Sequence, residues 1–272
     1  MTRTIFNNEQ KEYMAANYLT MRYREIADYL GFTERQVKGW INNNCDRKIR
    51  TFNSDYFANI TQPNQAYWLG FIYADGWVCN NSARSNYELG IELCKTDKQQ
   101  LIDFNNELGG VHIIKEEHHE KIICDNPNLS ITDSVIIRVY SKQIVQDLVR
   151  HNILENKTLK PDYPIVYDDL FFDFLRGYID GDGCIYFCEN KPSCSQVHIT
   201  SAHCEVFEYI QNKVEEYGIK SYIYQECEHK YRLVFTYKNA LKLLDLIYYD
   251  ENAQKLDRKY QKYLLIKKGS LN

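Results

Sequence analysis

The 272-residue sequence lacks the features that mark several common classes of protein. No stretch approaches the roughly 18 consecutive apolar residues of a membrane span, and the first residues lack the apolar run of a signal peptide. No glycine-rich phosphate loop, dinucleotide fingerprint or Ser-His-Asp order is present. These absences argue against a membrane protein, a nucleotide-binding enzyme and a serine hydrolase, and we expect a soluble chain in the cytoplasm of a bacterial or phage-infected cell.

Paired cysteine motifs are also missing. The nine cysteines are an odd number, and none of them forms a CxxC pair. This pattern favours reduced thiols over a disulfide framework or a zinc knuckle. Cys184, Cys188 and Cys194 could chelate a metal together with His198, but small buried residues on strands are the more ordinary interpretation.

Excess positive charge is missing from the chain as a whole, which has a net charge of −4. DNA-binding domains are often basic. The charge is uneven, however: residues 1–50 hold nine Lys and Arg against six Asp and Glu, and residues 255–268 hold six against one. Local basic patches of this kind can bind phosphate although the whole chain is acidic.

The first fifty residues predict three short helices, over about 8–19, 22–30 and 33–42. Gly31 falls in a tight turn, where glycine can adopt a positive φ without steric strain. Thr33 can cap the third helix. This order resembles a helix-turn-helix, with a third helix similar to the recognition helix of homeodomain-like modules, which reads the major groove. A three-helix bundle that binds protein is the alternative. The residues expected to contact DNA are Arg35, Gln36, Lys38, Asn42 and Asn43, followed by Arg47 and Lys48 in a linker.

The rest of the chain looks like one unit written twice. Each copy starts with an apolar helix that ends in Asp-Gly, at 66–78 and 174–187, and continues with a strand pair, a helix, a second strand pair and a closing helix. Such an order predicts an antiparallel sheet with helices on one face. We therefore expect a helix-turn-helix domain at 1–46, a linker at 47–62, a first repeat at 63–160 and a second repeat at 161–272 with a basic C-terminal helix.

The two Asp-Gly helices have small residues four positions apart, which form a flat stripe on one face of a helix. These residues are Gly70 with Ala74, and Gly177 with Gly181. Two such stripes allow two helices to pair closely around a pseudo-twofold axis. That pairing would bring Asp75 and Asp182 together at the two C-terminal ends.

Two carboxylates at the ends of paired helices are electrostatically unfavourable, because each helix end is already negative and the two charges repel. A divalent cation removes the problem, and carboxylate oxygens suit a hard ion such as Mg²⁺. The arrangement predicts a metal site for phosphodiester hydrolysis. The alternative is that Asp-Gly merely stops each helix, with the glycine as a left-handed cap.

The segments WLGFIYADG (68–76) and LRGYIDGDG (175–183) resemble the two nonapeptides that name the LAGLIDADG family. The resemblance covers about residues 60–265, and a helix-turn-helix ahead of two repeats is an arrangement seen in proteins of phages and mobile elements. It implies an α+β fold, in which two αββαββα repeats form a pseudo-twofold saddle on double-stranded DNA, and a chain that acts as a monomer. It also implies a site-specific homing endonuclease that uses Mg²⁺, with Mn²⁺ as a substitute. The metal ligands would be Asp75 and Asp182, assisted by the backbone carbonyls of Ala74 and Gly181.

Family members often place a basic residue near a strand end in each repeat. Lys95 is the candidate in the first copy, with Lys98 as the second choice, whereas the second copy has no lysine there and only His203 could substitute. This difference predicts that the two DNA strands are cut at unequal rates. Trp68 and Tyr73 depart from the usual residues of the first motif, but neither occupies a ligand position.

Alternating side chains on the strands predict further DNA contacts on the sheets, for which Arg138 and Arg232 are candidates. Two other functions stay open. Some transcription regulators join a LAGLIDADG-like fold to a helix-turn-helix without cutting DNA, and some family members help introns to fold as RNA maturases. Retention of both motif acids favours the endonuclease.

Overall fold

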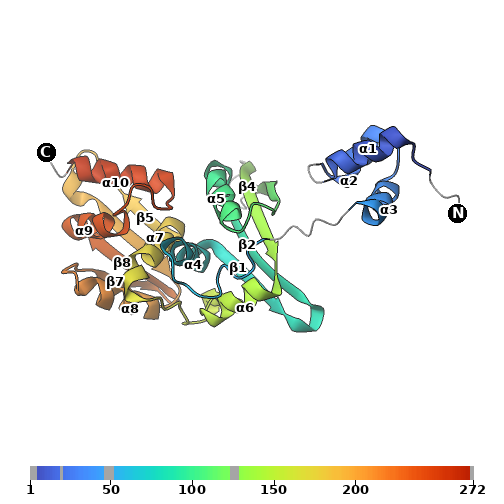
Figure 1. The fold of residues 1–272 in the computed structure, drawn as a ribbon. Coiled ribbons are helices and arrows are strands. Elements are labelled where there is room, and N and C mark those ends of the chain that lie inside the picture. The colour runs from blue at the N-terminus through green and yellow to red at the C-terminus, as the bar shows by residue number, and fades with distance from the viewer. Residues whose placement is uncertain (1–4, 19–20, 46–51, 123–128, 270–272) are drawn as a thin grey trace. The chain divides into compact units, whose positions relative to one another are not determined.

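The computed structural model describes residues 5–18, 21–45, 52–122 and 129–269, and the chain separates into two compact units, Met1–Thr51 and Phe52–Asn272 (Figure 1). Within the described residues, no helix has both the length and the apolar character needed to cross a membrane.

The first unit contains the three expected helices, α1 (Asn8–Asn17), α2 (Tyr23–Leu30) and α3 (Glu34–Asn44). Gly31 has a φ of 73° at the end of α2, as the turn requires. The Thr33 side chain caps α3. The apolar faces of the helices meet in one small core, made of Phe6, Met14, Ile26, Ala27, Val37 and Ile41.

The second unit contains the predicted order of elements twice, and the α+β fold class is confirmed. The first repeat consists of α4 (Pro63–Asp75), β1 (Gly76–Asn81), β2 (Asn86–Cys94), α5 (Lys98–Glu107), β3 (Ile114–Ile122), β4 (Leu129–Tyr140) and α6 (Lys142–Arg150). The second consists of α7 (Phe171–Asp182), β5 (Gly183–Tyr186), β6 (Gln196–Ser201), α8 (Glu205–Glu215), β7 (Tyr222–Cys227), β8 (Lys230–Thr236) and α9 (Tyr237–Ile247), with α10 (Asp257–Gly269) as the basic helix.

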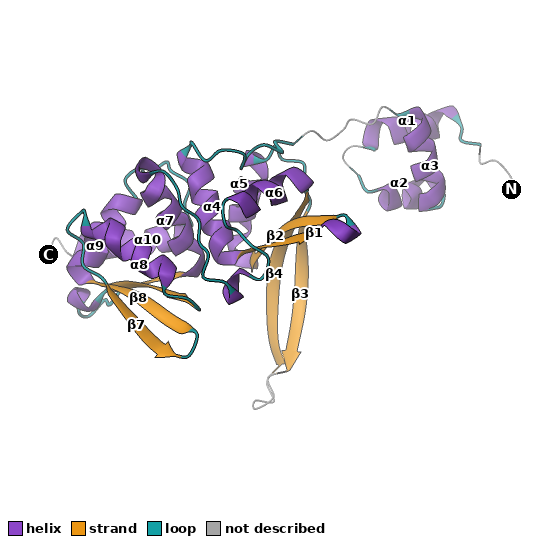
Figure 2. Cartoon of the chain, turned by 90° about the horizontal axis from the view of Figure 1, so that it is seen from below, coloured by secondary structure: helices purple, strands orange, loops and turns teal. Residues whose placement is uncertain are grey.

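Each repeat forms one antiparallel four-stranded sheet, with the strand orders β1-β2-β4-β3 and β5-β6-β8-β7. The helices lie on one side of both sheets (Figure 2). The registers also correspond, since Gly76 pairs with Ile91 in the first sheet and Gly183 pairs with Ile199 in the second. This correspondence allows residues of the two repeats to be matched one by one.

Helices α4 and α7 pack against each other through the predicted stripes of small residues, and the contact is reciprocal. A Cβ atom on Gly70 would overlap the carbonyl oxygen of Phe174, and one on Gly177 would overlap the carbonyl oxygen of Tyr67. The two helix backbones therefore touch around a pseudo-twofold axis. Both helices are deeply buried, with Trp68 entirely shielded from solvent.

Because backbone fills the space beside Gly177, the substitution Gly177→Ala should lower the free energy of unfolding of the second unit by about 3 kcal/mol, at the upper end of what overpacking costs. Chemical denaturation followed by circular dichroism measures the change. The matched control is Gly39→Ala in α3, where a Cβ meets nothing within 4 Å, and which should stabilise the first unit by about 0.5–1 kcal/mol. Unchanged stability of Gly177→Ala would contradict the backbone contact.

Candidate active site

The two motif acids are the last residues of the paired helices, Asp75 in α4 and Asp182 in α7. The following glycines are not left-handed caps: Gly76 and Gly183 have extended backbones, with φ of −84° and −78°. A Cβ at Gly183 would instead lie 2.5 Å from the carbonyl oxygen of Ile179. The glycines thus allow each chain to turn from its helix directly into the first strand of its sheet, which a simple helix stop does not explain.

The two acids lie next to each other where the helices meet. A Cβ on Gly181 would overlap the Cβ atom of Ala74, so only a glycine leaves room for the neighbouring helix, and the Asp75 Oδ2 atom lies 3.4 Å from the same position. Surrounding protein displaces water and raises the pKa of Asp182 to about 6, and the charge of Asp75 contributes in the same direction. Loss of hydration also raises the pKa of Asp75. Ionisation of both carboxyls is therefore unfavourable, and a nearby cation would stabilise the two negative charges.

Two lysines that sequence analysis missed bind the ends of these helices. The ammonium of Lys157 donates to carbonyl oxygens at the end of α4, those of Ile72 (2.8 Å), Ala74 (2.8 Å) and Gly76. The ammonium of Lys259 donates to carbonyl oxygens at the end of α7, those of Ile179 (2.8 Å), Asp180 (2.6 Å) and Gly181 (2.8 Å). Each lysine thereby donates to carbonyls at the helix end, where intrahelical donors run out, and places positive charge at the negative helix end.

The lysines also offset the charge of the two acids. Burial lowers the pKa of Lys157 to about 8, against the opposing effect of the Asp182 and Asp75 carboxylates. Burial lowers the pKa of Lys259 to about 8 as well. Both lysines lie outside the nonapeptides, beyond the closing helix of their repeats. The two lysines follow the closing helices at corresponding places in the two repeats. A comparison of the repeats for basic residues at equivalent positions could therefore have found them.

The donor set fits a divalent cation through the two carboxylates, which are hard oxygen ligands of raised pKa. The carbonyl oxygens of Ala74 and Gly181, which were expected to assist the metal, accept hydrogen bonds from the two ammonium groups instead. Each carbonyl oxygen keeps a second lone pair, so its contact with the metal stays a prediction beside the two carboxylates.

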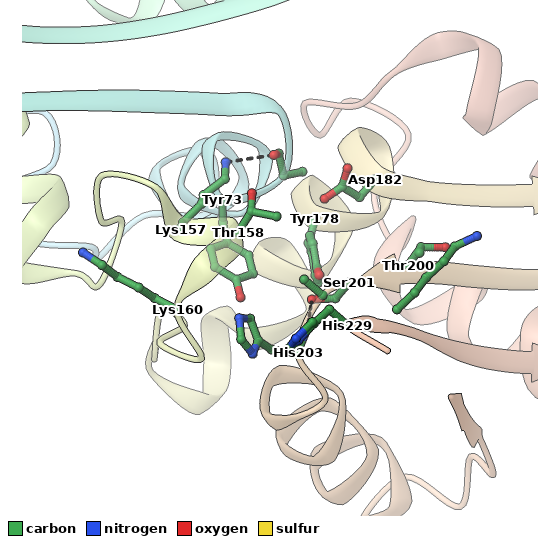
Figure 3. A pocket seen from close by; sticks show the side chains of 13 residues that line it. Tyr73, Lys157, Thr158, Lys160, Tyr178, Asp182, Thr200, Ser201, His203 and His229 are labelled. Atoms are coloured by element: carbon green, nitrogen blue, oxygen red, sulfur yellow. Dashed lines mark hydrogen bonds between the residues drawn. The ribbon is translucent and has the colours of Figure 1, made fainter. Parts of the chain in front are cut away.

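A cavity of about 350 Å³ opens beside Asp182, between the two repeats (Figure 3). Part of the Asp182 side chain faces solvent at the cavity, although enough protein surrounds its carboxyl to raise the pKa, and Asp75 is half-buried. The first repeat and the connection that follows it contribute Tyr73, Lys157 and Lys160, and the second repeat contributes Asp182, Ser201, His203, His229 and Lys230 among others. Lys157 is bound to helix carbonyls and Lys230 lies 2.8 Å from Glu226, so the cavity holds lysine ammonium groups beside the Asp182 carboxylate.

The surroundings of Asp75 differ from those of Asp182. Arg258 and Asp97 form an ion pair there, with Nε and Oδ2 3.0 Å apart, and both affect the pKa of Asp75. Lys95, the predicted basic residue of this half, lies 2.9 Å from Glu116, and Lys98 lies 2.7 Å from the same carboxylate. The two halves of the site thus have different polar partners.

The residues predicted to contact DNA fall into three groups. On α3, Arg35, Lys38, Asn42 and Asn43 are exposed. The Gln36 side chain accepts hydrogen bonds from the backbone N–H (2.9 Å) and hydroxyl (2.7 Å) of Thr33, so its observed role is helix capping. Arg138 lies 3.7 Å from Glu88, and Arg232 lies 2.6 Å from Glu226. Arg47 and Lys48 lie outside the described residues.

The cysteine-rich alternative for metal binding receives no support. In the part of the chain that the structure describes, no three His, Cys, Asp or Glu side chains are grouped to hold a metal ion. Cys184 does pair with His198 across β5 and β6, but they are only two residues.

Removal of the Lys259 ammonium should destabilise the second unit, because the three hydrogen bonds from this ammonium to carbonyl oxygens at the end of α7 are lost. We expect Lys259→Met to lower the free energy of unfolding by about 2 kcal/mol, the scale of charged hydrogen bonds. The control is Lys262→Met, an exposed lysine on the same helix, which should change stability by less than about 0.5 kcal/mol. Equal stability of both variants in chemical denaturation would show that the helix end does not need its lysine.

Comparison with known proteins agrees with this architecture. Residues 170–261 match the model of the LAGLIDADG-like domain family, and no curated protein matches the sequence. The structure of the meganuclease I-SmaMI bound to uncleavable DNA is similar, with a TM-score of 0.51 at 15% identity over 78% of this chain and 91% of that chain. A weaker likeness is to the homing endonuclease I-WcaI bound to its DNA recognition sequence, with a TM-score of 0.48 at 16% identity over 72% of this chain and 84% of that chain. Another is to the N-terminal LAGLIDADG domain of DUF199/WhiA, with a TM-score of 0.43 at 15% identity over 95% of this chain and 98% of that chain. Residues 170–261 are therefore a LAGLIDADG-like domain, and the two repeats together have the LAGLIDADG fold.

Proposed function

We propose that this chain is a homing endonuclease, which binds double-stranded DNA at a long target site and hydrolyses one phosphodiester in each strand. The observation that carries the proposal is the pair of acids, Asp75 and Asp182, at the ends of two helices in backbone contact. Purely structural carboxylates would gain nothing from such a position, since each helix end is negative and the charges repel.

The chemistry assigned to the chain's own residues follows from their positions. Asp75 and Asp182 would hold Mg²⁺, or Mn²⁺ in its place, and the bound cation would lower the pKa of a water molecule and neutralise charge on the phosphate. Lys157 and Lys259 keep the two helix ends, and so the two carboxylates, in place. Water oxygen bonds to phosphorus as the bond to the leaving oxygen breaks. That oxygen takes up a proton, which leaves a phosphate on one strand end and a hydroxyl on the other.

DNA contacts would come from the strand faces turned away from the helices and from α3. Arg138 and Arg232 lie on β4 and β8; Arg232 is 2.6 Å from Glu226, which limits its orientations, and Arg138 is 3.7 Å from Glu88. An arginine on such a strand can donate two hydrogen bonds to a guanine edge. The exposed Arg35 and Lys38 on α3 supply cations for phosphate contacts from the first unit.

A second candidate function is a non-catalytic DNA-binding regulator. The specific observation in its favour is that Lys157 and Lys259 already offset the charge of the acids without any metal. A site held by its own cations can be kept for stability alone. The two functions predict the same binding to DNA and differ in cleavage.

The endonuclease is tested by cutting of a DNA library, or of the gene's own uninterrupted insertion locus. Cutting at one site should require Mg²⁺ or Mn²⁺ and be lost with a chelator. Asp182→Asn and Asp75→Asn should each reduce cleavage at least about 100-fold while specific binding is retained, because metal-ligand charge is lost without a change of shape. Asp169→Asn, an exposed acid near the start of α7, is the control and should cut normally.

Full activity in either motif variant would place the chemistry elsewhere. Site-specific binding without cutting in either metal would instead support the regulator.

The contribution of α3 is tested by the salt dependence of DNA affinity. Removal of one cation that binds a phosphate should reduce the slope of log affinity against log salt by about 0.9, so Arg35→Ala and Lys38→Ala should each lower it by about one unit. Lys11→Ala, on α1, removes the same charge from another helix and should leave the slope unchanged. Fluorescence anisotropy over a salt series gives the slopes, and identical slopes in all variants would remove α3 from the DNA interface.

A further inference from the structure

The hairpin of β5 and β6 carries one cysteine on each arm, just beyond its last ladder pair. That pair is Tyr186 with Gln196, and the same register continued by two residues places Cys188 opposite Cys194. The two arms are still joined at this level, because the Cys188 backbone N–H donates to the Ser195 hydroxyl oxygen at 3.2 Å. The two cysteines therefore occupy facing positions at the end of the hairpin.

The first repeat has a true pair at the matching positions. Asn81 and Asn86 correspond to Cys188 and Cys194, each five residues from the glycine or isoleucine that opens its ladder, and the two asparagines are paired. Opposite residues of antiparallel strands have Cα atoms about 4.5–5.5 Å apart, within the roughly 4.4–6.8 Å that a disulfide spans. A bond between the two cysteines therefore requires no rearrangement of the sheet.

The residues between the cysteines fold back in two consecutive turns. The Lys191 N–H donates to the Cys188 carbonyl oxygen at 3.3 Å, and the Cys194 N–H donates to the Lys191 carbonyl oxygen at 2.8 Å. Both thiols also lie near one hydroxyl: a hydrogen bond with Cys188, together with the nearby Cys194, raises the pKa of Tyr186. The backbone turns and the shared phenol both place the two sulfur atoms close together.

The two thiols are free in the structure and differ in access. Cys194 is exposed and Cys188 is partly buried, so a reagent from solution reaches Cys194 first. Cys94 on β2 is a useful contrast. It is exposed as well, and a hydrogen bond with the Thr96 side chain lowers the pKa of its thiol, but the residue paired with it is Ser134. Cys94 therefore faces a hydroxyl where Cys194 faces a second thiol.

We propose that Cys188 and Cys194 form a reversible disulfide by exchange with an oxidised low-molecular-weight thiol such as glutathione disulfide. The Cys194 thiolate attacks one sulfur of the reagent and forms a mixed disulfide, and one glutathione thiolate leaves. The Cys188 thiolate then attacks the Cys194 sulfur, and the second glutathione thiolate leaves. The two released thiolates take up the protons that the cysteines gave up, so two cysteines are oxidised as one glutathione disulfide is reduced.

The disulfide lies beside the strand face proposed for DNA, so its effect on binding rests on the proposed function. Ile185 faces the core and is 1% exposed, and alternation along β5 turns Tyr186, the neighbour of both thiols, to the opposite face. Glutathione left on Cys194 would add a bulky group of net negative charge there, which repels phosphates. Closure of the disulfide with Cys188 removes that group, and the DNA face stays clear under oxidation.

The bond itself is tested by treatment of the full chain with glutathione disulfide, followed by digestion without reductant and mass spectrometry. A protease that cuts after glutamate separates the two cysteines at Glu189, so a disulfide holds two fragments together. Linked fragments should be the main product at this hairpin and should separate with dithiothreitol, whereas Cys94 in the same sample should keep glutathione. Cys188→Ser should keep glutathione on Cys194. Cys194→Ser should react at least about 10-fold more slowly at Cys188, because burial limits access.

The effect on DNA is tested by fluorescence anisotropy with a duplex that contains the selected target. Untreated wild-type chain and untreated Cys188→Ser should bind alike. After treatment, Cys188→Ser should bind at least about 5-fold more weakly than the wild-type chain, because both carry the same adducts elsewhere and differ by the charged group on Cys194.

Glutathione that stays on Cys194 of the folded wild-type chain would overturn the disulfide, and so would two free thiols at the hairpin in a sample where Cys94 has reacted. Equal binding by the treated wild-type chain and treated Cys188→Ser would overturn the protection of the DNA face. Linked fragments in a chain that binds no DNA before treatment would remove the proposed function, while the disulfide would stand.

Discussion

The backbone contact between α4 and α7 is the constraint on which the rest of the second unit depends. Gly70 and Gly177 admit the carbonyl oxygens of the opposite helix, and this reciprocal fit sets the pseudo-twofold axis. Each sheet is then joined to its helix by the extended glycine that follows the motif acid. The axis therefore fixes the positions of the two sheets and of Asp75 and Asp182 at the same time.

That geometry creates an electrostatic problem, which the chain solves partly by itself. The two carboxylates lie at negative helix ends, and loss of hydration raises the pKa of both. Lys157 and Lys259 place one ammonium at each helix end, which offsets part of this negative charge. The balance is stable enough to keep the site assembled, yet two hard carboxylates of raised pKa still suit a divalent ion. Assembly of the site and its proposed binding of metal thus depend on the same four side chains.

The order of elements could be predicted from the sequence because each repeat has clear boundary signals. These are an Asp-Gly after an apolar helix and strands in which apolar and polar residues alternate. The small-residue stripes also predicted the helix contact. The lysine caps were not predicted, because Lys157 and Lys259 reach the motifs through tertiary structure, and only their matching positions after the closing helices give a sequence signal. Nor could sequence show that Gln36 is occupied by helix capping, because capping and base contact need the same amide group.

The measurement that tests the central claim most directly is the position of a bound metal. A crystal of the chain with its DNA target and Mn²⁺ should show an anomalous scattering peak between the Asp75 and Asp182 carboxylates, at metal–oxygen distances of about 2.0–2.2 Å. Lys157 and Lys259 should remain on their helix ends in that complex. Anomalous peaks only elsewhere, with the two acids neutralised by the lysines alone, would contradict the account.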